Sequence, residues 1–325
     1  SGVQGAQVVN KHKVHVLIDL VGYTGGGERA NEVFAVRPAK LQTSYMGFCA
    51  STGATYMQHI IVDKIVAPPE YRSHFSEKLT IVPNSYFCND HRQQPEWQHI
   101  PSPTITRNNF SELPSEGLLL ACFNQLYKID PPVFDVWMKI LKKNDDAYLW
   151  LLKFPPVAVD NIKKEAKKRG IESDRLVFGN TLPKKEYLER GAIADLFLDT
   201  PLVNAHTSAT DVLWAGVPMV TTGRESMISR VAPSLVLAAQ RSEMVTKNLD
   251  DYERVVSKLI GTSATPTRQL RHLKDMTFRS KENSPLFDTQ LWVKHLDVSF
   301  KLAWESHLTG KDYHVIVRDT IATPS

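Results

Sequence analysis

The segment that decides the fold runs from Ala194 to Thr222 and reads ADLFLDTPLVNAHTSATDVLWAGVPMVTT. Ala194–Asp199 is an apolar run typical of a buried strand, Asp211–Gly216 has the composition of a helix, and Pro218–Thr222 that of a second strand. Strands and helices that alternate in this way indicate an α/β protein with a parallel sheet.

The helix in this segment opens with His206, Thr207 and Ser208. Free backbone N–H groups and the positive end of the helix dipole lie at such a position, where phosphate oxygens bind. The glycine fingerprint of dinucleotide-binding turns is absent here. Taken alone, the pattern is better explained as an ordinary Ser/Thr cap on a core helix.

A second segment favours the phosphate site. The apolar run Leu118–Cys122 precedes FNQLYK, and a helical pattern follows at Val133–Leu141. Gln125 and Lys128 are therefore expected in a loop at the carboxyl end of a strand, where open α/β sheets bind ligands. In that position Lys128 is better interpreted as a phosphate partner than as a solvated surface lysine.

A third segment follows the short strand pattern Leu176–Phe178, and its Pro183 suits the first turn of a helix. Lys184, Tyr187 and Arg190 then share one helical face. Tyr187 could stack on a base while Lys184 reaches a phosphate or a base edge. In isolation, the segment would be interpreted as a surface helix of mixed charge.

Longer phrases of the chain are similar to the catalytic region of the eukaryotic O-GlcNAc transferases, above all to the plant secret agent branch. The matching phrases are Phe123–Pro131, Leu149–Pro155, Leu198–Ser208, Asp211–Thr221, Ser229–Ala232 and Ser284–Thr289. The resemblance extends from about His15 to about His314. It implies two Rossmann-like α/β lobes of the GT-B glycosyltransferase type, with the first lobe incomplete.

The resemblance, together with composition, predicts three parts of the chain. Residues 1–110 would form a partial first lobe with its linker, 111–288 the UDP-binding second lobe, and 289–325 a closing helix and tail. The Pro-rich, aperiodic stretch Asn89–Glu116 marks the predicted lobe boundary. Thr289–His307 is the predicted closing helix, and the tail from Thr309 is expected to be loose.

The resemblance also implies a role for each candidate site residue. Gln125 and Lys128 would contact UDP, with Lys128 stabilising the departing diphosphate. Asp211 would lie at the ribose, and His15 would serve a polar role near the acceptor. The uracil would be held by Leu182, Pro183, Lys184, Tyr187 and Arg190, and the pyrophosphate by His206, Thr207 and Ser208.

The implied activity is inverting transfer of GlcNAc from UDP-GlcNAc to Ser or Thr hydroxyls of intracellular proteins. No cofactor is expected. Because no Asp-x-Asp occurs in the sequence, a metal-clamped diphosphate is not expected either. Two alternatives stay open. One is a nucleotide-sugar-binding pseudoenzyme or fragment, and the other is O-fucosyl transfer from GDP-fucose, as in the spindly branch, against which Gln125 and His206 argue.

Two departures from the family limit the expected activity. The tetratricopeptide repeats and a His-Pro-x-(Ser/Thr)-His segment are absent, so the chain is expected to be either a fragment or the product of a truncated gene. In both cases it is expected to transfer sugar poorly or not at all alone. In addition, the loop Phe48–Ala54 lacks the Pro-Gly pair of the family, which changes its backbone freedom.

Composition fits a globular enzyme portion: 325 residues, 42% of them hydrophobic, can bury a substantial core. The net charge of +4 is too small to indicate nucleic-acid binding. Cys49, Cys88 and Cys122 form neither a disulfide framework nor a zinc pattern, which favours a reducing compartment. No membrane partner is expected, and the predicted location is the cytoplasm and nucleus.

Overall fold

The computed structural model describes residues 1–311 and 313–319, and it divides into two compact units. The first contains Ser1–Cys88 together with the segment from Thr289 onward, and the second contains Asn89–Asp288. The boundary therefore differs from the one placed after residue 110. The linker packs with the second unit because its side chains are bonded there, and α10 (Thr289–Leu308) groups with the first unit.

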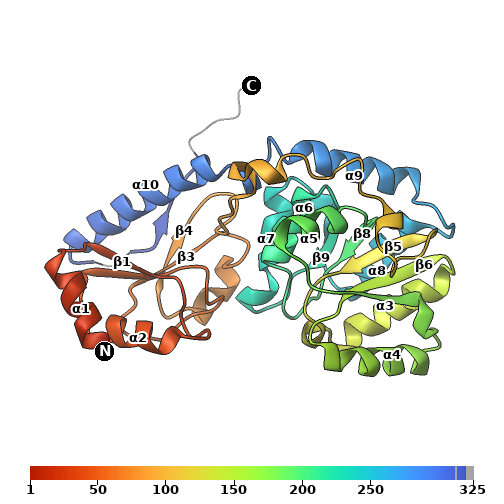
Figure 1. Ribbon diagram of the computed structural model, residues 1–325. Coiled ribbons are helices and arrows are strands. Elements are labelled where there is room, and N and C mark those ends of the chain that lie inside the picture. Colours follow the sequence, from red (N-terminus) through yellow and green to blue (C-terminus); the bar gives the residue numbers. More distant parts are fainter. Residues whose placement is uncertain (312, 320–325) are drawn as a thin grey trace. The chain divides into compact units, whose positions relative to one another are not determined.

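The first unit is built on a five-stranded sheet whose neighbouring strands are all parallel, in the order β1-β2-β3-β4-β11. Figure 1 labels most of its elements. Besides α10, these are α1 (Gly2–Lys11), β1 (Val16–Asp19), α2 (Gly27–Ala35), β2 (Leu41–Ser44), β3 (His59–Val62), β4 (Lys78–Ile81) and β11 (Val315–Ile316).

Strand β11 corrects the expectation of a loose tail. Val315 pairs with Thr80 and Ile316 with Ile81, so the chain after α10 adds an edge strand to the sheet. Val315 is buried against Leu41 and Ala303, which supplies the apolar contact that holds so short a strand. Residues 320–325 of the predicted tail lie outside the described residues.

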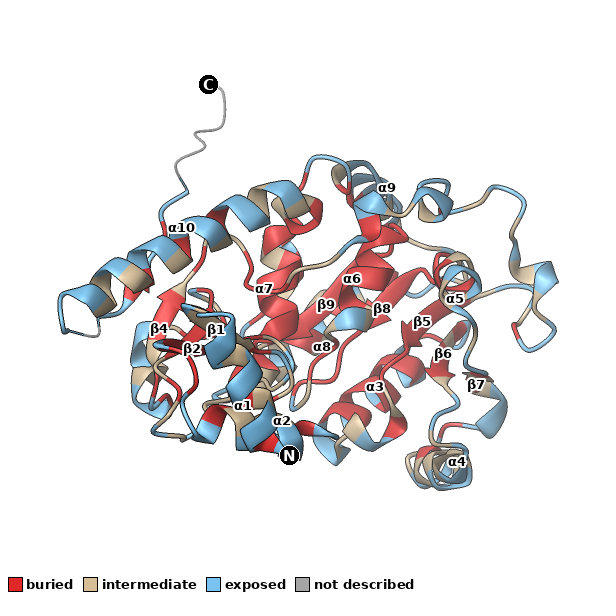
Figure 2. Cartoon of the chain, turned by 60° about the vertical axis from the view of Figure 1, so that its left-hand side comes forward, coloured by how far each residue is buried: buried red, intermediate tan, exposed pale blue. Residues whose placement is uncertain are grey.

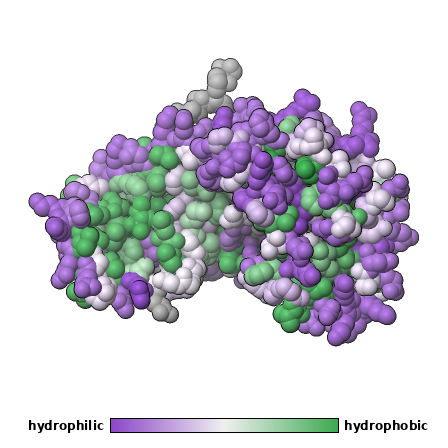
Figure 3. Space-filling view, viewed as in Figure 1, coloured by the Kyte–Doolittle hydropathy of each residue, from purple (hydrophilic) through white to green (hydrophobic). Residues whose placement is uncertain are grey.

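Helix α10 buries a narrow polar and small-residue stripe, His295, Ser299 and Ala303. Its Val293 and Val298 remain exposed on the outer side. Figure 3 shows further apolar side chains gathered on the visible surface of the first unit, below this helix.

The second unit holds a six-stranded parallel sheet in the order β10-β9-β8-β5-β6-β7. Its strands are β5 (Leu118–Cys122), β6 (Ala147–Leu152), β7 (Leu176–Gly179), β8 (Leu196–Leu198), β9 (Met219–Thr222) and β10 (Val245–Thr246). Its helices are α3 (Pro131–Lys143), α4 (Val159–Lys168), α5 (Lys184–Gly191), α6 (Thr207–Trp214), α7 (Val231–Ala238), α8 (Leu249–Ile260) and α9 (Arg268–Ser280).

Strands β5, β8 and β9 are buried at every position, which explains their continuous apolar sequences. Figure 2 shows this buried sheet between two helical layers. Helices α3 and α8 contact each other on one face, and α5, α6 and α7 contact in sequence on the other. The prediction of an α/β unit with a parallel sheet is confirmed, as are the strand-helix-strand assignments within Ala194–Thr222.

The strand order reverses between β5 and β8. From β5 the chain moves outward to β6 and β7, and it then returns to β8 on the other side of β5. Loops that leave two neighbouring strands in opposite directions open a crevice at the carboxyl edge of the sheet, and ligands of open α/β folds bind there. The fold therefore brings the loops after β5 and β8 to one place.

Candidate functional site

The loops after β5 and β8 meet where the strand order reverses, a place called the switch point below. Asn124, directly after β5, connects these two loops. Its Nδ2 donates to Asp199 Oδ1 at 3.1 Å and to Thr200 Oγ1 at 2.7 Å. Its Oδ1 accepts from Ser208 Oγ at 3.0 Å. One buried amide thus links the β5 loop, the β8 loop and the first turn of α6, which fixes where the amino-terminal end of that helix points.

Asp199 shapes the loop between β8 and α6. Its carboxylate is 1% exposed and accepts from Ala205 N at 2.8 Å and Thr221 Oγ1 at 2.6 Å. Burial raises the pKa of this carboxyl from 3.8 to about 6, although its hydrogen bonds act in the opposite direction. A carboxylate that receives this many donors closes the loop into a single conformation.

Lys128 and His206 lie at the start of α6. Lys128 ends the 3₁₀ turn η5 (Leu126–Lys128), and its Nζ donates to Asn204 O at 3.3 Å. His206 is the N-cap residue of α6, and its Nε2 donates to Ile228 O at 3.2 Å. Burial lowers the pKa of His206 to about 4, and the Lys128 charge acts in the same direction. Near neutral pH the cation at this helix end is therefore Lys128, while His206 is neutral.

The other residues of the first two segments lie around this point. Thr207 is exposed on the first turn of α6, and Ser208 is half-buried against Asn124. Gln125 is half-buried beside η5, where its Oε1 accepts from the exposed Tyr127 hydroxyl. The predicted grouping of Lys128, His206 and Ser208 is thus present in the structure.

Helix α5 presents the third segment to α6. Pro183 precedes the helix as its N-cap residue and is not part of the first turn. Lys184 Nζ forms an ion pair with Asp211 Oδ1. Tyr187 packs edge-on against Phe123, with ring centroids 5.7 Å apart, and burial raises the pKa of its phenol well above 10. Tyr187 therefore acts as a neutral aromatic surface.

Arg190 continues this face of α5 into the interior. It is 2% exposed, donates to Asn180 O at 2.7 Å, and places its guanidinium 5.6 Å from the Trp150 ring centre. A hollow of about 370 Å³ beside α5 is lined by Arg190, Asn180, the half-buried Leu182 and the carboxylate of Glu112. The predicted face of Lys184, Tyr187 and Arg190 thus points inward.

Asp211 belongs to a buried network. It is 4% exposed, and its Oδ1 accepts from His91 Nε2 at 2.8 Å as well as from Lys184. His91 comes from the linker segment, which the sequence marked only as a boundary. No local pattern could have identified it, because the contact joins residues 120 positions apart in the chain.

His15 lies elsewhere. It is exposed, directly precedes β1 and meets the Trp304 ring edge-on at 4.9 Å. The turn at Gly22–Thr24 follows the carboxyl end of β1, so His15 lies at the opposite end of that strand. The polar role near the acceptor expected for His15 stays a prediction.

The loop Phe48–Ala54 is organised by one buried carboxylate. Glu77 is 1% exposed and accepts from Ser51 Oγ at 2.8 Å and from Thr52 through both its backbone N, at 2.7 Å, and its Oγ1, at 2.5 Å. Side-chain bonds therefore hold this loop, although it lacks the Pro-Gly pair of the resembling family.

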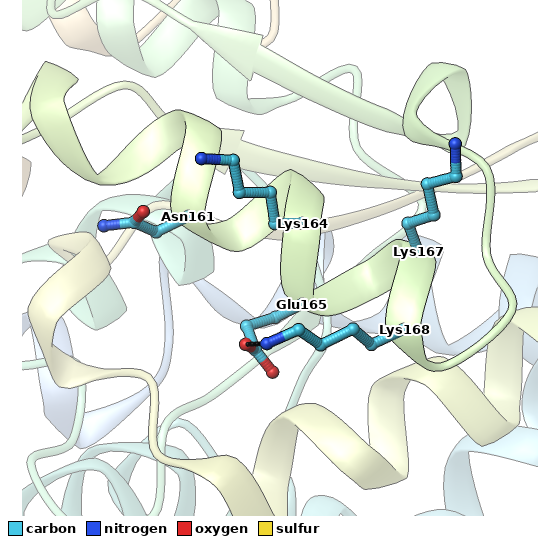
Figure 4. Close-up of a pocket in the computed structure, with 5 residues that line it drawn as sticks. All are labelled: Asn161, Lys164, Glu165, Lys167 and Lys168. Atoms are coloured by element: carbon cyan, nitrogen blue, oxygen red, sulfur yellow. Dashed lines mark hydrogen bonds and ion pairs between the residues drawn. The ribbon is translucent and has the colours of Figure 1, made fainter.

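A larger surface hollow of about 490 Å³ lies along α4 and is lined by Lys164, Lys167, Lys168, Glu165 and Asn161 (Figure 4). Lys168 pairs with Glu165 at 2.7 Å. Lys167 and Lys168 lie in the last turn of α4, where cations interact favourably with the negative end of the helix dipole. The hollow shares no residue with the switch point.

Within residues 1–311 and 313–319, no group of three or more His, Cys, Asp or Glu side chains is arranged to hold a metal ion. In the same residues, no helix is long and apolar enough to cross a membrane.

Residues 2–109 and 97–296 match glycosyl transferase family 41. The chain belongs to this family. It is 40% identical, over 94% of its length, to the Arabidopsis thaliana protein named probable UDP-N-acetylglucosamine–peptide N-acetylglucosaminyltransferase SEC. It is 28% identical over 98% of its length to the corresponding Caenorhabditis elegans transferase, and 26% identical to the Petunia hybrida protein SPINDLY.

The chain spans 31 to 36% of the length of these relatives. Among solved structures, the O-GlcNAc transferase of Thermobaculum terrenum (a K341M mutant) superposes with a TM-score of 0.83 at 24% identity, over 95% of this chain and 56% of that one. Anabaena HepE in complex with UDP superposes with a TM-score of 0.60 at 9% identity, over 91% of this chain and 82% of that one. The resemblance and the predicted GT-B fold are confirmed.

Proposed function

We propose that this chain carries the donor site of a protein O-GlcNAc transferase, which moves GlcNAc from UDP-GlcNAc to Ser or Thr hydroxyls with inversion. The proposal rests on the cluster of Lys128, His206 and Ser208 at the switch point of a chain that belongs to family 41. Lys128 and the amino-terminal end of α6 meet there through Asn124 and Asn204. The 40% identity to the Arabidopsis SEC protein supports the choice of donor.

The proposed role of the switch point is to stabilise the negative charge of the leaving group. When the bond between the sugar and UDP breaks, negative charge develops on the departing diphosphate. Lys128 and the backbone N–H groups of Thr207 and Ser208 would stabilise that charge, and prearranged donors of this kind lower the barrier most effectively. His206 is neutral near pH 7 and would contribute hydrogen bonding rather than charge.

The nucleoside part would lie along α5. Tyr187 offers a neutral aromatic surface, and Leu182 and Arg190 border the hollow of about 370 Å³ in which a uracil would fit. Pro183, the N-cap residue of α5, directly follows Leu182 and would complete the uracil site. Lys184 would reach the uracil edge or a phosphate, Asp211 would contact the ribose, and Gln125 would contact the nucleotide from the β5 loop. We propose that no metal ion takes part, because Lys128 and α6 supply the charge that a metal-dependent Asp-x-Asp site would provide.

The acceptors would be proteins, consistent with the peptide substrates that the names of the relatives specify. We propose the cytoplasm and nucleus as the location. No disulfide joins Cys49, Cys88 or Cys122 in the structure, and the proposed location is a reducing compartment. Neither membrane nor nucleic acid is a proposed partner.

Transfer of radiolabelled GlcNAc from UDP-GlcNAc to a Ser/Thr-rich peptide tests the proposal, with labelled GDP-fucose as the competing donor. The proposal predicts GlcNAc transfer that Lys128→Met abolishes, either by this chain or by a version extended at its amino terminus. Transfer of fucose instead would assign the chain to the spindly type. UDP binding without transfer by either version would indicate a binding module.

A further inference from the structure

Besides the contact between His91 and Asp211, three hydrogen bonds join the segment Asn89–Ile100 to the rest of the second unit. Asn89 Nδ2 donates to Leu286 O at 2.7 Å, and Trp214 Nε1 donates to Trp97 O at 3.0 Å. Lys281 Nζ donates to Ile100 O at 2.6 Å and lies 4.8 Å from the Trp214 ring centre. The segment therefore forms part of the wall around α6 rather than a flexible connection.

His91 lies inside this wall. It is 2% exposed, and its ring centre is 5.2 Å from that of Trp97, 5.9 Å from that of Trp214 and 5.8 Å from that of Phe287. Its Nδ1 faces Asn89 Oδ1 at 3.2 Å. Three aromatic rings and one amide leave the imidazole a single orientation, in which Nε2 points at the Asp211 carboxylate.

The two partners of Asp211 differ in how firmly they are held. His91 Nε2 and Lys184 Nζ both bond to Oδ1, but the Lys184 side chain is 36% exposed and the His91 side chain only 3%. Lys184 can turn toward a nucleotide that arrives, whereas His91 cannot move away. A buried carboxylate needs a donor that stays in place, since an unpaired buried charge is costly.

We propose that His91 is a positioning residue for the donor nucleotide, because it holds Asp211 in the orientation that binds the ribose hydroxyls. The inference rests on the proposed function and adds to it a residue outside the phrases shared with the family. His91 occupies Oδ1 and so directs Oδ2 to the ligand. Without His91, the Asp211 carboxylate would turn toward Lys184, and both side chains would be withdrawn from the nucleotide.

The test compares His91→Phe, which keeps the aromatic contacts but loses the donor, with His91→Gln, which restores an N–H donor. Binding of UDP and of 2′,3′-dideoxy-UDP is measured by calorimetry on the full chain. The wild type is expected to prefer UDP. His91→Phe should weaken UDP binding about tenfold, as loss of one buried hydrogen-bond partner does, and leave the dideoxy analogue almost unaffected. His91→Gln should recover much of the loss.

Two controls separate positioning from folding. Lys281→Met loosens the same segment without touching Asp211, so it should lower the melting temperature and keep the preference for UDP. Asp211→Asn should remove the preference, and adding His91→Phe to it should cause no further loss. If His91→Phe is not recovered folded, Asn89→Ala releases the other side of the ring and should lower the preference by a smaller factor.

The outcomes are distinguishable. If the wild type fails to bind UDP, the proposed function and this inference both fall. If the wild type prefers UDP and His91→Phe, or Asn89→Ala in its place, keeps that preference in full, the proposed function stands and the role of His91 is refuted. Equal weakening of both ligands by His91→Phe would also refute it, because a purely structural role acts on both.

Discussion

Replacement of Asp199 by Asn should change how the stability of the second unit depends on pH. The buried carboxylate accepts Ala205 N and Asn124 Nδ2 on Oδ1 and the Thr221 hydroxyl on Oδ2. An Asn side chain keeps the first oxygen and presents its NH₂ to the hydroxyl, which can also accept. These three hydrogen bonds can therefore form in the variant, and the desolvated charge is removed.

The magnitude follows from the pKa of this carboxyl. Burial raises it from 3.8 to about 6, so the contribution of Asp199 to stability is present below pH 4 and is lost as the pH rises through 6. Since one pKa unit corresponds to about 1.4 kcal/mol, the loss amounts to about 3 kcal/mol. The free energy of unfolding of Asp199→Asn, relative to wild type, should therefore increase by about that amount between pH 4 and pH 7.

His206 provides an opposite control in the same loop. Its pKa is lowered from 6.5 to about 4, so its contribution is present above pH 6.5 and is lost as the pH falls through 4. Between pH 4 and pH 6.5, the contributions of Asp199 and His206 to the pH dependence of the wild type's free energy of unfolding nearly cancel. As the pH rises over this range, His206→Gln should therefore lose stability relative to wild type, while Asp199→Asn should gain stability relative to wild type.

Urea unfolding followed by tryptophan fluorescence at pH 4.5, 5.5, 6.5 and 7.5 measures these differences for the wild type and the two variants. Trp137, Trp150 and Trp214 are fully buried in the second unit and report its unfolding. A difference between Asp199→Asn and wild type that stays constant over the pH range would refute the reasoning. So would a variant that is less stable than wild type at every pH.

Two further substitutions test the site and its support. Lys128→Met should weaken UDP binding by about 1.5–3 kcal/mol, the value of a hydrogen bond to a charged group, with little change in melting temperature; unchanged affinity in calorimetry would remove Lys128 from the site. Gly179→Ala should destabilise the chain by about 1–3 kcal/mol, because its Cβ would lie 2.9 Å from Trp150 Nε1 and 3.2 Å from an Arg190 guanidinium nitrogen. Gly25→Ala, whose Cβ meets no atom within 4 Å, is the matched control, and equal melting temperatures for the two variants would contradict this packing.

The second unit was predictable because its local patterns agree with its packing. Leu118–Cys122 forms β5 with the predicted bounds, since every side chain of that run is buried. Helix α6 begins at Thr207 with His206 as its N-cap residue, in agreement with the predicted helix start at His206–Ser208. The grouping of Lys128 with this helix end was also accessible from sequence, because the carboxyl ends of neighbouring parallel strands lie on one edge of the sheet.

Contacts between distant segments were not predictable. His91 lies in a stretch without periodicity, and its role depends on Asp211, which is far away in the chain. The strand β11 has two residues, too few to show an alternating pattern, and it exists because β4 offers an unpaired edge. His15 lies in an exposed position before β1, and its role near the acceptor, which was assigned by resemblance alone, stays a prediction.

Calorimetric titration of the chain with UDP and with GDP, each with and without EDTA, tests the central claim most directly. The account predicts that UDP binds more tightly than GDP and that EDTA leaves the UDP affinity unchanged, because Lys128 and the start of α6 supply the charge for the diphosphate. Preference for GDP, or loss of UDP binding in EDTA, would contradict it.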